Sequence, residues 1–128
     1  TVEKMRIDGE DIPIIDAKKT HRGYEVWFGS EKLKPKINRE VKIEIEILTK
    51  KAKGNRTFPV YLLYPTRGLE IKFHYENANL RNVRAESFFA GRHPQAAVSS
   101  KRGKSIEIQL SNEEWVFPTS GVIFIWDV

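Results

Sequence analysis

The chain has 128 residues, no cysteine, and 22 lysines and arginines against 17 aspartates and glutamates, so its net charge is +5. A chain of this length suits one domain and buries a hydrophobic core without disulfide or metal cross-links. The lack of cysteine excludes disulfides, zinc sites with thiolate ligands and cysteine nucleophiles. No apolar run approaches the roughly 18 residues of a membrane span. We therefore expect a single domain over residues 1–128, with the polar residues 1–20 loosely attached.

The N-terminus gives a second expectation. The chain opens with Thr1-Val2-Glu3-Lys4 and has no initiator methionine. The opening also lacks the basic segment, apolar segment and small-residue cleavage site of a secretory signal. We therefore expect an excised domain or a processed product of a larger protein, located in the cytoplasm.

Alternation of apolar and polar side chains predicts most of the secondary structure. The clearest case is residues 40–48, which read E-V-K-I-E-I-E-I-L. A strand places the β-branched side chains of this segment on one face, whereas a helix scatters them around its circumference. The four side chains expected to point inward are Val41, Ile43, Ile45 and Ile47. In chain order, the predicted strands are residues 24–28, 40–48, 58–63, 69–75, 83–89, 106–110, 115–117 and 122–126.

The spacing of these strands indicates the fold class. Strands recur about every 12 residues, with turn residues between them, as in all-β sandwiches and barrels. We expect single helical turns at most, at residues 77–82 and at 111–114, where Ser111 is a suitable cap. The prediction is an all-β antiparallel β-sandwich of about eight strands with little helix, with a barrel as the alternative.

Positive charge concentrates in residues 81–104. This segment holds six lysines and arginines against Glu86 alone, which gives +5 and equals the excess of the whole chain. The guanidinium group of arginine binds phosphate through paired N–H groups, and hydroxyl groups donate to the same oxygens. Glycines such as Gly91 and Gly103 let backbone N–H groups turn toward an anion. The candidate ligand-binding residues are Arg92, His93, Ser99, Ser100, Lys101, Arg102 and Lys104. The expected ligand is a nucleotide or nucleic acid.

The same segment also has a simpler interpretation. Loops between strands are polar because water satisfies their backbone groups, so an ordinary surface loop explains the composition equally well. The phosphate-binding fingerprints G-x-x-x-x-G-K-[ST] and G-x-G-x-x-G do not occur in the chain.

The three tryptophans differ in their expected burial. Trp126 shares an apolar strand face with Phe124 and belongs in the core. Trp27 lies in a short aromatic segment that permits either face, although a core position is favoured. Trp115 follows two acidic residues, and an exposed position is as compatible with the sequence as a buried one.

Adjacent apolar residues support an alternative function. In a strand, neighbouring residues point to opposite faces, so one of Phe88 and Phe89 must leave the core and cover a second surface or form a contact patch. Ile123 and Ile125 likewise give the last strand two apolar faces. With an exposed Trp115, these features predict a protein–protein interaction or oligomerisation module.

Catalysis, metal binding and cofactors find little support in the sequence. His21, His74 and His93 have no metal-ligand spacing, and the aspartates form no calcium loop. No serine lies in a G-x-S-x-G elbow, and the side chains of Glu113 and Glu114 diverge in either a strand or a helix. We expect a non-enzyme without metal or cofactor, and keep a hydrolase with its site near His93 as a minor alternative.

The last two-thirds of the chain show a resemblance to a known class of domain. The motif-bearing segments are P-T-R-G-L-E-I-K-F at Pro65 to Phe73, the tryptophan Trp115, and F-P-T-S-G-V-I-F-I-W at Phe117 to Trp126. They resemble the Ig-like β-sandwich accessory domains at the ends of bacterial signalling and conflict-system proteins. The resemblance implies an Ig-like fold and a sensor or scaffold role beside an effector domain. It carries no site residues, since no family motif matches position by position.

Overall fold

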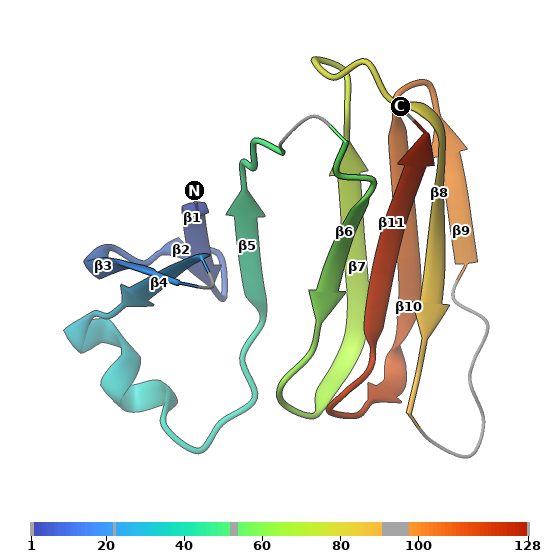
Figure 1. Cartoon of the computed structure of the whole chain (residues 1–128). Coiled ribbons are helices and arrows are strands. Elements are labelled where there is room, and N and C mark those ends of the chain that lie inside the picture. The colour runs from blue at the N-terminus through green and yellow to red at the C-terminus, as the bar shows by residue number, and fades with distance from the viewer. Residues whose placement is uncertain (1, 22, 52–53, 91–97, 128) are drawn as a thin grey trace. The chain divides into compact units, whose positions relative to one another are not determined.

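The computed structural model describes residues 2–21, 23–51, 54–90 and 98–127 and divides the chain into two compact units (Figure 1). The N-terminal unit comprises residues 1–51 and the C-terminal unit residues 52–128. Antiparallel strands dominate both, so the all-β prediction is confirmed. The single-domain expectation stays a prediction. No helix in the described ranges has the length and apolar character needed to cross a membrane.

The C-terminal unit contains two antiparallel sheets of three strands each. The first has the order β6-β11-β8 and the second the order β7-β10-β9, so the consecutive strands β10 and β11 form the two centres (Figure 1). The strand bounds are β6 Thr57–Tyr61, β7 Thr66–His74, β8 Arg81–Phe88, β9 Val98–Arg102, β10 Ser105–Val116 and β11 Gly121–Asp127.

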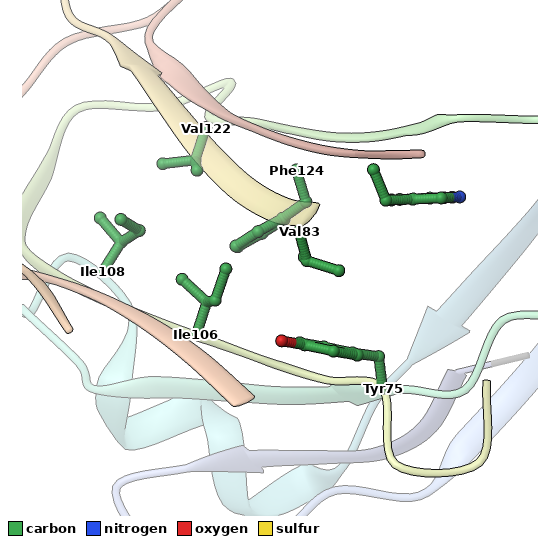
Figure 2. Packing of buried hydrophobic residues seen from close by; sticks show 7 residues of the cluster. Tyr75, Val83, Ile106, Ile108, Val122 and Phe124 are labelled. Atoms are coloured by element: carbon green, nitrogen blue, oxygen red, sulfur yellow. The ribbon is translucent and has the colours of Figure 1, made fainter. Parts of the chain in front are cut away.

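The hydrophobic core of the C-terminal unit lies between these sheets. Figure 2 shows Val122 and Phe124 of β11 on one side of the core and Ile106 and Ile108 of β10 on the other. All four side chains are buried and belong to one cluster, which also includes Trp126, as predicted. Because the buried positions alternate along each strand, the two sheets form the expected β-sandwich.

Stacked aromatic rings connect the two sheets. The ring of Phe73 on β7 stacks on that of Phe124 on β11, with 4.6 Å between centroids and 13° between planes. Phe73 also stacks on Trp126 at 5.9 Å and on Phe58 of β6 at 6.2 Å. Such ring pairs stabilise a core beyond the area they bury.

The course of β10 differs from the predictions in two details. Residues 106–110 and 115–117 were predicted as separate strands, but β10 runs through both, with a register shift between Leu110 and Trp115. The helical turn expected at 111–114 is therefore wrong. Ser111 accepts a hydrogen bond from the Glu113 N–H at 3.3 Å, because a serine that suits a helix cap also suits a local turn within an irregular strand.

The N-terminal unit has a three-stranded sheet, a hairpin and a short helix. The sheet has the order β2-β1-β5, and β3 pairs with β4. Ser30 caps the 3-10 helix by accepting a hydrogen bond from the Lys32 N–H at 3.2 Å. The bounds are β1 Val2–Ile7, β2 Glu10–Asp11, β3 Ile14–Thr20, β4 Gly23–Phe28, η1 Glu31–Lys36 and β5 Ile43–Ile47.

Asp8 links the turn after β1 to the rest of the N-terminal unit. Its carboxylate accepts hydrogen bonds from the Lys36 ammonium and, at 2.8 Å, from the Lys42 backbone N–H. These two donors hold the pKa of Asp8 below its ordinary value, with Lys36 the larger cause. The carboxylate thereby ties η1 and the start of β5 to the sheet.

The strand predicted at 40–48 is confirmed as β5, but its apolar face is exposed within the N-terminal unit. The three isoleucines of β5 are between 52% and 56% exposed. In the described part of the N-terminal unit, the buried apolar side chains are Ile7 and Ile12. Within the N-terminal unit, the expected burial of Ile43, Ile45 and Ile47 is therefore wrong, because alternation predicts an apolar face without supplying what covers it.

Candidate functional site

The predicted ligand-binding residues fall into two groups. Arg92 and His93 lie outside the described residues. The others occupy the β9–β10 hairpin: Ser99, Ser100, Lys101 and Arg102 lie in β9, and Lys104 lies in the turn. The four residues in β9, predicted as loop, are thus in an edge strand. This strand was missed because V-S-S-K-R lacks apolar alternation.

Strand pairing separates these residues instead of gathering them. Lys101 is opposite the buried Ile106 and Ser99 is opposite Ile108, whereas Ser100 and Arg102 are opposite residues of the outer face. Lys101 extends across the sandwich edge, where its ammonium donates to the Val83 carbonyl on β8 at 3.4 Å. Because β9 and β8 are edge strands of different sheets, this contact connects the two layers.

The pairing register brings together a different set of polar residues on the outer face of the β7-β10-β9 sheet. Ser105 of β10 is paired with His74 of β7 on one side and with Arg102 of β9 on the other. We call these three residues the polar row. His74 lies next to the inward-facing Phe73 in β7 and therefore faces outward, but only the register shows that it shares a row with Ser105 and Arg102.

The tight turn between β9 and β10, formed by Gly103 and Lys104, joins Arg102 and Ser105 of the polar row. Gly103 has a φ of +55°, which suits the first central position of a type II′ hairpin turn. The Tyr75 N–H donates to the Lys104 carbonyl at 3.0 Å, and the Tyr75 hydroxyl donates to the Gly103 carbonyl at 3.4 Å. The turn is therefore anchored to a buried tyrosine.

Carboxylates occupy the neighbouring positions on the same face. Lys72 and Glu107 are paired in the next row, and the Lys72 ammonium lies 3.0 Å from Glu70. The hydrogen bond and charge of Glu70, followed by the charge of Glu107, raise the pKa of Lys72. The outer face is thus mixed in charge: the polar row lies next to a row in which Lys72 is accompanied by the carboxylates of Glu70 and Glu107.

A second candidate surface lies at one end of the sandwich. Large apolar side chains that are between 50% and 77% exposed occur at the end of β6, in the loop after it and around the end of β10. We call this set the apolar end: Tyr61, Leu63, Tyr64, Trp115 and Phe117. The exposure of Trp115 that the interaction hypothesis requires is present.

Hydrogen bonds hold the two loops of the apolar end together. The Leu62 N–H donates to the Ser120 carbonyl at 2.9 Å, and the Thr119 N–H donates to the Leu62 carbonyl at 3.2 Å. The fully buried Ser120 also accepts, through its hydroxyl, the Ala90 N–H at 2.7 Å. Reciprocal backbone bonds of this kind present the apolar side chains from an ordered base.

Two aromatic rings extend the apolar end onto the outer face of the β6-β11-β8 sheet. Phe88 and Tyr61 flank Gly121 in the register, and their ring centroids are 5.7 Å apart. Ile123 lies on the same face and is half-buried. Phe88 is therefore the member of the Phe88–Phe89 pair that covers this outer surface.

Comparison of the chain with models of protein families, with curated proteins and with solved structures finds no match. Within the described ranges, no three residues of the types His, Cys, Asp and Glu form a group that could hold a metal ion. The surfaces described above, the apolar end and the polar row, are the candidate functional sites.

Proposed function

We propose that the C-terminal unit is a non-catalytic protein-binding module that contacts its partner through the apolar end. The observation that carries this proposal is that five exposed large apolar side chains lie in or beside two loops that backbone hydrogen bonds join. Single exposed apolar residues are normal, whereas a contiguous patch marks a contact site, and aromatic residues are enriched at such sites. Membership of a larger cytoplasmic signalling protein stays a prediction from the sequence.

The apolar end is tested by panning a library of displayed random peptides against the full chain. Aromatic and aliphatic peptides are expected to be enriched, and Phe117→Ala is expected to weaken their binding about tenfold, as loss of an interface anchor does. The matched control is Ile37→Ala, which truncates an exposed side chain of the N-terminal unit. Enriched peptides that bind Phe117→Ala as tightly as the unchanged chain would contradict the proposal.

Binding of an anionic ligand through the polar row is the second candidate function. The observation that favours it is the alignment of a guanidinium, a hydroxyl and an imidazole on three adjacent strands, at Arg102, Ser105 and His74. Neighbouring strands are about 4.8 Å apart, so groups in one row are close enough to share the oxygens of a phosphate. A nucleotide or a nucleic-acid backbone supplies such oxygens.

A thermal-shift assay with ATP and a short single-stranded oligonucleotide tests the polar row at low and high salt. We expect stabilisation at low salt that declines steeply as salt rises, because phosphate contacts release counterions. Arg102→Ala is expected to remove most of the shift, whereas Lys72→Ala, whose ammonium is paired with Glu70, is expected to retain it. An equal shift for both variants would exclude the polar row as the site.

A further inference from the structure

The β2-β1-β5 sheet has one apolar and one charged face. Residues paired between β1 and β5 share a face, so the register sorts them directly. The apolar pairs are Ile7 with Ile43, Met5 with Ile45 and Val2 with Ile47. The charged pairs are Arg6 with Glu44 and Lys4 with Glu46.

Opposite charges match across the charged face. The Arg6 guanidinium lies 2.9 Å from Asp11 of β2 and 3.9 Å from Glu44 of β5. Lys4 lies 3.6 Å from Asp11. The cations of β1 are thus placed between acidic residues of the two flanking strands. β5 presents glutamates at alternate positions, and the first of them, Glu44, also lies 3.1 Å from the ammonium of Lys42.

Within the N-terminal unit, β5 has an exposed apolar face and one edge without a further strand in the described residues. The sheet order places β5 at an edge, with β1 as its ladder partner in the described residues. In an antiparallel edge strand, alternate residues direct their N–H and C=O groups away from the sheet, which makes the edge a template for strand addition. The isoleucines of β5 are also more than half exposed, so an added strand has apolar side chains to contact.

We propose that β5 accepts an extended segment of a partner protein in which lysines or arginines alternate with aliphatic residues. β1 shows the chemistry that fits, because its Lys4 and Arg6 lie opposite Glu46 and Glu44 while its aliphatic residues lie opposite the isoleucines. A strand on the outer edge of β5 meets the same alternation of carboxylate and isoleucine. Main-chain hydrogen bonds then supply affinity, and alternate side chains supply specificity.

The charge pattern of β5 argues against a second copy of β5 as the occupant. Antiparallel pairing of two such strands places glutamates opposite or diagonal to glutamates, and like charges in these positions are destabilising. A basic segment removes this conflict. The inference concerns the N-terminal unit and does not depend on the function proposed for the apolar end.

Three synthetic peptides test the inference on the full chain by fluorescence anisotropy. The first alternates lysine with isoleucine or valine, the second has glutamate in place of lysine, and the third is a scrambled version of the first without alternation. We expect the alternating basic peptide to bind about tenfold more tightly than the scrambled one, with affinity that falls as salt rises. The acidic peptide is expected not to bind.

Two variants locate the binding. Glu46→Gln is expected to weaken binding of the basic peptide about threefold, as loss of one exposed charge pair does. Glu10→Gln, on the opposite edge strand β2, is the matched control and is expected to retain full affinity. Amide hydrogen exchange on the unchanged chain is expected to show that the peptide slows exchange in residues 43–47. Because the exchange measurement uses the unchanged chain, its result is valid even if a variant is less stable.

The remaining outcomes overturn the proposal. The first is equal binding of the basic and scrambled peptides, and the second is protection confined to the apolar end. The third is that the β5 amides directed away from β1 are already protected without peptide because the C-terminal unit covers them. The fourth is sedimentation showing dimers held through β5.

Discussion

Replacement of Phe124 with alanine is expected to lower the free energy of unfolding of the C-terminal unit by about 3 to 5 kcal/mol. The Phe124 side chain is fully buried at the centre of the core and stacks on Phe73 from the opposite sheet. Alanine leaves a cavity that the surrounding strands fill only in part. Urea unfolding followed by tryptophan fluorescence measures the loss, since Trp126 lies in the same core cluster.

Phe117→Ala is the matched control for this prediction. The chemical change is the same, but Phe117 is half exposed at the apolar end, so its stability cost is expected to be about 1 kcal/mol or less. The two variants also separate stability from binding, because only Phe117 belongs to the proposed contact surface. Equal destabilisation by both substitutions would show that Phe124 is not at the centre of the core.

Gly121→Ala is expected to destabilise the C-terminal unit by about 3 kcal/mol, the upper part of the range for overpacking. A Cβ atom at this position would lie 2.1 Å from the Val60 carbonyl oxygen and 3.0 Å from Cζ of Phe88. The carbonyl belongs to the backbone of β6, which cannot retreat without disturbing its ladder with β11. Thermal unfolding of the variant measures the cost.

Gly29→Ala provides the comparison for Gly121→Ala. Its Cβ would meet the end of the Ile15 side chain at 3.2 Å, and a flexible side chain yields more easily than a strand backbone. We expect a change within about 0.5 kcal/mol, typical of a surface position. If the two alanine variants lost equal stability, the backbone approach at Gly121 would not be the cause.

Alternation was sufficient to predict the strands with a clear apolar face. Residues 69–75 and 122–126 correspond to β7 and β11, and Trp126 lies in the core as expected. The same principle missed β9 because its polar residues gain their strand conformation from pairing with β10 and not from a buried face of their own. The helix η1 was missed as well, since E-K-L-K-P-K shows no apolar period and contains Pro35.

The candidate sites could be predicted only in part. The sequence was compatible with either an exposed or a buried Trp115. The rule that adjacent strand residues diverge predicted that one of Phe88 and Phe89 leaves the core, but the structure was needed to show that it is Phe88 and that it contacts Tyr61. The polar row depends on which residues of three strands are paired, and a single sequence does not reveal this register. For the same reason the basic residues of β9, adjacent in sequence, were grouped in one site although pairing directs Lys101 and Arg102 to opposite faces.

The close approach of two backbones at Gly121 also supplies a criterion for recognising distant relatives. A protein that keeps this ladder must have glycine at the start of the central strand, followed by inward apolar residues at the first, third and fifth positions after it, here Val122, Phe124 and Trp126. In this chain the two residues paired with that glycine, Tyr61 and Phe88, are in ring contact with each other. Such a spatial signature outlasts overall sequence similarity, because it is set by steric exclusion.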